Sequence, residues 1–381
     1  MDDALPKLRP PERLLCGPGP TNVDPAVLEA MTRPMLGHLD PRMHEILLDV
    51  VDLLRRVYRM PDGLVLPLHC TGTAGMEAGI VNLVEPGDTV IVAQCGFFGR
   101  RIAEIARRHG AVLVAAEADW GESVSNAAIM EALDRHPEAR MVAVVHAETS
   151  TGVEHPLAEL GALLRERDTL LMADCVTSLA GVPLEVGEWG VDFAYSCTQK
   201  CLAAPPGMSP VAVSERAMDR LRSRRTPVPF TFDLLLLARY WVERPATYHH
   251  TAPILGIYSL HEALCGVLRE GLEARWTRHA EAAGHLQDSL ESRGLELLAE
   301  HDHRLAPLTA VRVPEGMDGK AVQGRMLRDH SIEIGGGLGP DAPAMWRIGL
   351  MGQNATVETA DRVLAALDAA LAEEAAPALV S

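Results

Sequence analysis

The sequence predicts an α/β protein with a mostly parallel sheet and a smaller C-terminal α+β domain. Between about residues 64 and 214, apolar runs of strand length alternate with amphipathic helical patterns, and the runs are apolar on both faces. Such strands are typical of a parallel sheet that is covered by helices on both sides. From about residue 253 the pattern changes to a long helical stretch followed by shorter strands.

The elements follow one another in a regular order. We expect large-sheet strands at 64–69, 88–94, 111–118, 141–148, 169–176, 193–197 and 209–214, with helices at 74–84, 99–110, 126–136 and 157–168. A helix over 259–294 then leads to strands at 308–313, 332–337 and 346–350. The expected organisation is an N-terminal arm contributing to the active site over 1–22, a large ligand-binding domain over 23–252 and a small domain over 253–381.

Composition and charge exclude several classes of partner. Hydrophobic residues make up 48% of the 381 residues and aromatic residues 4%, so the core is mainly aliphatic. The net charge of -17 argues against binding to nucleic acid or to an anionic membrane surface. No apolar stretch approaches membrane-spanning length, and the acidic N-terminus lacks the apolar run of a secretory signal. We therefore expect a cytoplasmic protein.

The cysteines indicate a reduced protein without a metal site. There are seven of them, scattered and mostly within apolar runs. An odd, scattered set is typical of intracellular proteins without disulfides. Cys197 and Cys201 are separated by three residues but lack a second pair at the spacing of a zinc site. We expect no metal.

Lys200 lies in the segment "FAYSCTQKCLAAPPGMSP" (193–210), which otherwise resembles protein interior. Lysine is seldom buried without a partner or a chemical task. One interpretation is a side chain that extends from a strand end to solvent. The other is an amine kept for covalent chemistry with a carbonyl group.

Small polar residues follow the first predicted strand, where parallel sheets place their ligands. Thr71, Gly72 and Thr73 come just before a helix, whose N-terminal N–H groups favour a phosphate. The segment lacks the spacing of a dinucleotide fingerprint or a P-loop. Since Ser and Thr are also common helix caps, a purely structural turn is the alternative interpretation.

Two further side chains stand at predicted strand ends. Phe98 lies at a strand-to-helix turn, where its ring belongs either to the core or against a flat ligand. Asp174 ends a very apolar strand and needs a cationic or hydrogen-bonding partner there, unless it caps a helix. Pyridoxal phosphate needs a lysine, a carboxylate for its ring nitrogen, an aromatic face and an anion cradle. Together with Lys200 and the phosphate turn, these residues predict that cofactor.

Several ordered segments carry a resemblance to a known family. They are "GPGPTN" (17–22), "LGHLDPRM" (36–43), "EPGDTV" (85–90), "HAETSTGV" (146–153), "ADCVTSLAG" (173–181), "SCTQKCLAAPPGMSP" (196–210), "YHHTAP" (248–253), "GGLGP" (336–340) and "WRIGLMGQNAT" (346–356). With them the chain resembles the class V, fold-type I pyridoxal phosphate aminotransferases, and within these the alanine-glyoxylate and serine-pyruvate aminotransferases. The resemblance covers nearly the whole chain.

The resemblance implies roles around the cofactor ring. Lys200 is implied to bond the cofactor and to move the substrate proton, and Asp174 to pair with the ring nitrogen. Val176 is implied to pack against one face of the ring. Phe98 occupies the place where the family often has Trp, so stacking is kept but the indole N–H is lost. Thr149 is implied to approach the phenolic oxygen.

The resemblance also implies a phosphate site shared between two subunits. Gln199 is implied to hold the phosphate together with Thr71, Gly72 and Thr73, and the family commonly has His where this chain has Thr73. Tyr248 and Thr251 look like phosphate contacts from the neighbouring subunit of a homodimer. The adjacent histidines of "YHHT" do not suit a metal pair, because neighbouring residues on one helix face diverge.

Arg347 is the expected substrate anchor. A guanidinium offers two parallel N–H bonds to an α-carboxylate, although a salt-bridged structural arginine is the alternative. Gly19 in "GPGP" is expected to bring backbone close to the reacting carbon without side-chain bulk. A small acceptor pocket follows.

The expected activity is transfer of an amino group from alanine or serine to glyoxylate or pyruvate in two half-reactions, by a ping-pong mechanism. Related sequences use ureidoglycine, pyridoxamine or aminoethylphosphonate, but segment 225–241 is closer to the alanine-glyoxylate pattern. A lyase, desulfurase or epimerase on the same fold stays an alternative. A desulfurase needs a catalytic cysteine on a flexible loop, whereas these cysteines lie mostly in apolar runs. Lys200 and Asp174 argue against a non-enzymatic binding protein.

Overall fold

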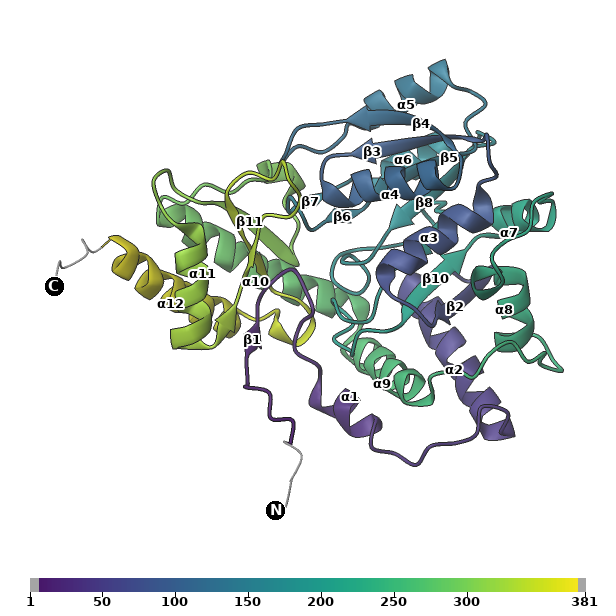
Figure 1. The fold of residues 1–381 in the computed structure, drawn as a ribbon, viewed down its shortest axis with the longest axis horizontal. Coiled ribbons are helices and arrows are strands. Elements are labelled where there is room, and N and C mark those ends of the chain that lie inside the picture. The colour runs from purple at the N-terminus through teal and green to yellow at the C-terminus, as the bar shows by residue number, and fades with distance from the viewer. Residues whose placement is uncertain (1–6, 376–381) are drawn as a thin grey trace, which may run out of the picture.

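The computed structural model describes residues 7–375, and its centre is a seven-stranded sheet (Figure 1). The strand order is β2 (Leu64–Leu68), β10 (Ser209–Val213), β9 (Phe193–Tyr195), β8 (Leu170–Asp174), β5 (Met141–Val145), β3 (Thr89–Gln94) and β4 (Val112–Glu117). Strand β10 runs antiparallel to both of its neighbours, and the pairs from β9 to β4 are parallel. The predicted α/β class with a mostly parallel sheet is confirmed.

Helices connect the strands and cover the sheet. They are α2 (Pro41–Tyr58), α3 (Gly72–Leu83), α4 (Phe97–Arg108), α5 (Asn126–Arg135), α6 (Leu157–Leu164), α7 (Glu215–Arg222) and α8 (Leu234–Trp241). Strands β2, β5, β8 and β10 are buried along their whole length, including the edge strand β2. Burial on both faces is the reason why these strands are apolar at every position.

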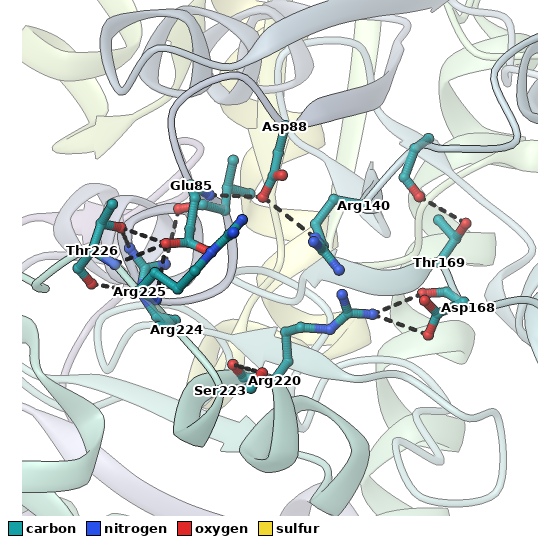
Figure 2. A network of polar contacts seen from close by, with 12 residues as sticks. Glu85, Asp88, Arg140, Asp168, Thr169, Arg220, Ser223, Arg224, Arg225 and Thr226 are labelled. Carbon is teal, nitrogen blue, oxygen red and sulfur yellow. Dashed lines mark hydrogen bonds and ion pairs between the residues drawn. The ribbon is translucent and has the colours of Figure 1, made fainter.

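The ends of the sheet differ in chemistry. At the ends where β3, β5 and β8 begin, Arg140 lies 3.3 Å from Asp88 and Arg220 lies 3.0 Å from Asp168, each across a nitrogen–oxygen pair (Figure 2). These ion pairs tie together loops that are distant in sequence. The polar residues predicted to form the site lie at the opposite ends of the strands.

A second, smaller core lies beside the large sheet, at the left in Figure 1. It is built from α10 (Leu272–Ser292), α11 (Gly319–His330), α12 (Val357–Ala375), and a sheet in the order β11 (Leu308–Arg312), β14 (Met345–Gly349) and β13 (Gly335–Gly336). Near the N-terminus, β1 (Leu14–Leu15) pairs with β12 (Ile332–Glu333). The N-terminal arm is therefore held by the smaller unit. Shorter elements are α1 (Pro25–Ala30), β6 (Ala147–Glu148), β7 (Val153–Glu154) and the 3₁₀ turns Phe230–Phe232, His301–His303 and Gly352–Asn354.

The expected helix over 259–294 is two helices, so that expectation is wrong in one respect. Helix α9 (Ile254–Glu270) ends at Gly271, whose φ of 87° and ψ of 139° are outside the helical region. Glycine adopts such a positive φ without steric cost, which allows the chain to turn there. Helix α9 packs into the large core, whereas the later turns of α10 pack into the smaller one. The domain division at residues 252 and 253 stays a prediction.

No helix among residues 7–375 combines the length and the apolar character that a membrane crossing requires.

Candidate active site

A cavity of about 170 Å³ lies at the carboxyl ends of the large-sheet strands. The loops after β2, β3, β5, β8 and β9 all reach it, as expected for a parallel sheet. The predicted site residues that line it are Thr71, Gly72, Thr73, Phe98, Thr149, Asp174, Val176, Gln199 and Lys200. The fold thus gathers residues that are up to 129 positions apart (200 minus 71) in the chain.

Lys200 is 9% exposed and lies at the inner wall of the cavity. Its Nζ donates a hydrogen bond to the Pro18 carbonyl oxygen of the N-terminal arm. Gly19 has a φ of 102°, and a Cβ at that position would lie 2.6 Å from the lysine Nζ. Burial lowers the pKa of Lys200, which increases the neutral, nucleophilic fraction of the amine. The interpretation of Lys200 as a solvent-exposed strand-end side chain is wrong.

Asp174 is the last residue of β8 and is buried. Its Oδ1 accepts a hydrogen bond from the Val176 N–H at 2.9 Å, and its Oδ2 accepts one from the Tyr195 hydroxyl at 2.5 Å. Burial raises the pKa of Asp174 to about 6, and these hydrogen bonds and the nearby Lys200 oppose the shift. The strand is followed by turns, so Asp174 does not cap a helix. A buried carboxylate of this kind suits a cationic ring N–H.

The turn before α3 contains the helix cap that the sequence allowed, and its role in binding a phosphate stays a prediction. The Thr71 Oγ1 accepts from the Ala74 N–H at 3.2 Å and so caps the helix. Gly72, the next residue, packs closely against the loop after β9. A Cβ at this position would lie 3.2 Å from the Cys197 Cβ. N–H groups in a first helical turn have no acceptor within the helix, so they suit an anion.

Two buried polar atoms on the cavity wall also fit a phosphorylated cofactor. The Gln199 Oε1 and the Thr177 Oγ1 have no hydrogen-bond partner among the described residues, and both residues line the cavity. Buried polar groups are normally satisfied, which indicates that a polar ligand completes this wall. With the helix N-terminus, Asp174 and Lys200, these residues fit pyridoxal phosphate.

Glu148 is a site residue that the sequence reasoning missed. It is fully buried, and its Oε2 accepts from the N–H groups of Phe98 at 3.0 Å and Gly99 at 3.2 Å, at the start of α4. Its Oε1 accepts from the Ser150 hydroxyl at 2.6 Å. Burial raises the pKa of Glu148, while these hydrogen bonds oppose the shift. Glu148 therefore holds the helix turn that carries Phe98, and the acid within "HAETSTGV" was the available signal.

Arg347 lies in the centre of β14 and is 6% exposed. Its Nε donates to the Gly336 carbonyl at 2.6 Å and its Nη1 donates to the Thr149 carbonyl at 3.1 Å. Burial lowers its pKa to about 10, so the guanidinium stays cationic at neutral pH. Among residues 7–375 no carboxylate lies within ion-pair distance of the Arg347 guanidinium, although the charge of the nearby Glu148 raises its pKa against the effect of burial. Arg347 is therefore not held by a structural salt bridge in the described part of the chain. A buried, unpaired guanidinium suits an anionic substrate.

Tyr248 and Thr251 do not line the cavity of their own chain. Both are exposed, and the Tyr248 ring lies 5.5 Å from the His38 ring, centroid to centroid. Their contribution to a neighbouring subunit stays a prediction. The adjacent His249 and His250 contact each other through their Nδ1 atoms at 2.9 Å. In the described part of the chain, no three His, Cys, Asp or Glu side chains are grouped as metal ligands.

Comparisons with known proteins agree with this geometry. The family model "Aminotransferase class-V" matches residues 14–358. Alanine–glyoxylate aminotransferase of Drosophila melanogaster is 38% identical over 366 residues, covering 95% of this chain and 93% of that protein. (S)-Ureidoglycine–glyoxylate transaminase of Bacillus subtilis is 35% identical over 380 residues, covering 95% and 91%.

Solved structures have the same fold. Alanine–glyoxylate aminotransferase from Nostoc sp. superposes with a TM-score of 0.93 at 46% identity, covering 96% of this chain and 97% of that one. Pyridoxamine-pyruvate aminotransferase from Mesorhizobium loti superposes with a TM-score of 0.90 at 28% identity, covering 96% and 93%. The chain belongs to the class V aminotransferase family and is a pyridoxal phosphate-dependent transaminase of fold type I.

Proposed function

We propose that the protein transfers the amino group of a small amino acid, alanine or serine, to glyoxylate or pyruvate. The observation that carries the proposal is the buried Arg347 guanidinium, which is held by two carbonyl groups and forms no direct ion pair with a carboxylate among the described residues. Thr149, one of its two acceptors, also lines the cavity that contains Lys200. The arrangement supports a substrate with a carboxylate on its reacting carbon. The names of the relatives from Drosophila and Nostoc support glyoxylate as the acceptor.

The residues of this chain have separate tasks in the reaction. When bound, pyridoxal phosphate supplies the carbonyl group that receives the amine and the ring that withdraws electrons. Arg347 binds the α-carboxylate and so orients the amino acid. Lys200 Nζ, with its lowered pKa, accepts the proton from the substrate α-carbon and returns a proton in the second half of the transfer. Asp174 provides the negative charge that faces the ring nitrogen.

The arm limits the size of the substrate. A side chain at Gly19 would collide with Lys200, so the backbone of this segment approaches the amine closely. Gly335 of β13 is as tightly packed, since a Cβ there would lie 2.5 Å from the Pro18 Cδ. The arm therefore has little room to move away from the lysine, which supports a preference for small side chains.

A panel of amino donors tested against glyoxylate and pyruvate examines the substrate directly. Alanine and serine are expected to give the highest kcat/KM, and bulky donors such as phenylalanine to be poorer by at least about tenfold because of the close-packed arm. Initial rates at varied donor and acceptor concentrations should give the parallel lines of ping-pong kinetics. The relatives named for ureidoglycine and pyridoxamine make these two compounds the most informative additional donors. If an amine without an α-carboxylate is the best donor, the protein is a specialised transaminase instead.

We also propose that the enzyme is a homodimer with shared active sites. Large apolar side chains are exposed in the segments that carry Tyr248 and its neighbour His38; they are Leu28, Met35, Leu39, Phe230 and Tyr248 itself. Exposed apolar groups of this size support burial against a second copy.

Two defective variants can test whether the sites are shared. Lys200→Ala and Tyr248→Ala are each expected to lower activity. If Lys200 and Tyr248 of different subunits form one site, a mixed dimer of the two variants contains one intact site and one doubly altered site. Co-expression should therefore restore up to about half of the normal activity per mixed dimer. Activity no greater than the sum of the separate variants, or sedimentation of the unaltered protein as a monomer, contradicts the proposal.

A further inference from the structure

Tyr195 and Asp174 occupy matching positions at the ends of two neighbouring strands. Strands β8 and β9 are parallel, and their register pairs Asp174 with Tyr195, each the last residue of its strand. Paired residues of adjacent strands have side chains on the same face of the sheet. The phenol oxygen consequently lies 2.5 Å from the Asp174 Oδ2, at the short end of the range for a hydroxyl bonded to a carboxylate.

The Tyr195–Asp174 contact is buried, and both residues form part of the cavity wall. Tyr195 is 0% exposed and Asp174 is 3% exposed, yet both residues line the cavity. The Asp174 Oδ1 is occupied by the Val176 N–H, so the tyrosine hydroxyl and this N–H together fix both carboxylate oxygens. A carboxyl group held at both oxygens has little freedom to rotate, which suits an acceptor that must face one ligand atom.

Burial and the neighbouring groups have opposite effects on the pKa of Asp174. The pKa of Asp174 is raised to about 6; burial contributes most to the rise, and the nearby Glu148 also acts in this direction. The Tyr195 hydroxyl, the Val176 N–H and Lys200 act in the opposite direction. Burial also raises the pKa values of the neighbouring Cys175 and Tyr195 groups, so neither adds a negative charge at neutral pH.

We propose that Tyr195 is a positioning residue that keeps Asp174 ionised and aimed at the ring nitrogen of pyridoxal phosphate. The proposal rests on the role of Asp174 put forward above. A protonated Asp174 would donate to an unprotonated ring nitrogen, whereas an ionised Asp174 accepts from a ring N–H. The ring withdraws electrons best in the second state. A hydroxyl that donates to the carboxylate favours the ionised form and thus the state that the reaction needs.

The alternative is that Tyr195 only fills the core. Tyr58 offers a matched control, because it is also a fully buried tyrosine of the large core and its hydroxyl donates to the Pro210 carbonyl at 2.8 Å. Tyr58→Phe and Tyr195→Phe each remove one buried hydroxyl and keep the ring. Both should lower the free energy of unfolding, since each leaves a buried acceptor with one donor fewer. If Tyr195 acts through Asp174, Tyr195→Phe should also weaken cofactor binding, whereas Tyr58→Phe should not.

Affinity for pyridoxal phosphate, measured by titrating the cofactor-free full chain, gives a readout separate from turnover. Tyr195→Phe should raise the dissociation constant about tenfold, the scale of a hydrogen bond to a charged group. In the Asp174→Asn background the same change should have less than about a twofold effect, because two groups that act as one unit are not additive. Tyr58→Phe should leave the constant unchanged in both backgrounds.

The ionisation of Asp174 can be followed in the same cofactor-free protein by ¹³C NMR of labelled aspartate. Tyr195→Phe should move the Asp174 midpoint upward from about 6, because the lost hydrogen bond favoured the ionised form. If Tyr195→Phe does not fold, the hydroxyl proton resonance of Tyr195 in the unaltered protein can be measured instead. It should be shifted far downfield, and Asp174→Asn should remove that shift.

The outcomes separate the two proposals. Asp174→Asn is expected to slow turnover about a hundredfold; unchanged turnover and cofactor affinity would overturn both the role of Asp174 and that of Tyr195. An impaired Asp174→Asn with a normal Tyr195→Phe overturns the role of Tyr195 alone. Additive effects of the two changes, or an Asp174 midpoint that does not move, likewise overturn the role of Tyr195.

Discussion

Replacement of Lys200 by alanine is expected to reduce transamination by about ten-thousandfold. The change removes the group proposed to carry the proton and to bond the cofactor, and general acid–base catalysis alone contributes up to about this factor. The structure places the amine in the cavity that Asp174 also lines, and burial lowers its pKa; no second lysine among residues 7–375 lines the wall. Initial rates with alanine and glyoxylate measure the effect.

The covalent bond can be located independently, because the sequence contains only three lysines, Lys7, Lys200 and Lys320. The unaltered holoenzyme should show the visible absorption band of a lysine-bound cofactor, and borohydride should trap the cofactor on the peptide that contains Lys200. Lys320→Ala is the matched control, since Lys320 is exposed at the start of α11 and should be dispensable. A trapped adduct on Lys7 or Lys320 would disprove the assignment.

Arg347→Ala is expected to lower kcat/KM by about thirty- to a thousandfold for donor and acceptor alike. A charge-assisted, two-bonded pair with a carboxylate in a partly desolvated site is worth about 2 to 4 kcal/mol, and each 1.36 kcal/mol is about tenfold in rate. Both half-reactions place a carboxylate at the same guanidinium, so the loss should appear in each. Separate half-reaction kinetics, followed through the cofactor absorbance, measure it.

Two variants make the test specific for the guanidinium. Arg347→Lys keeps a positive charge but loses the planar pair of N–H groups, so it should recover only part of the efficiency. Arg312→Ala is the control on the adjacent strand β11, where Arg312 pairs with Glu296 at 2.8 Å. An exposed pair of this kind contributes little, so activity should be kept. A loss for the amino acid but not for the oxo acid would contradict a single anchor.

The sequence by itself was sufficient to predict the strands of the large sheet and the polar residues near their carboxyl ends. Strands buried on both faces have a pattern that is local and strong, so the ends of β2, β3, β5 and β8 could be predicted to within about three residues. Asp174 is the last residue of such a strand, and Lys200 lies in the loop that follows β9. Because parallel strands place their carboxyl ends at one edge, their convergence followed from the pattern alone.

Other features depended on the tertiary structure. Glu148, Tyr195 and Arg347 act through partners that lie 50, 21 and 198 positions away in the chain, at Phe98, Asp174 and Thr149. No local pattern encodes such contacts, because strand register and the docking of the smaller unit decide them. The break of the long helical stretch at Gly271 is similar, since a helix-compatible sequence surrounds it and packing selects the positive φ.

The sequence alone therefore determined the fold class and the chemistry that is available at the strand ends, since burial and side-chain type are local properties. The tertiary structure decided the pKa values of those groups. Burial raises the pKa of Asp174 and lowers that of Lys200, and the hydrogen bond from Tyr195 opposes the first of these shifts. Such shifts arise from desolvation and from neighbours brought together by folding, so they exist only once the chain is packed.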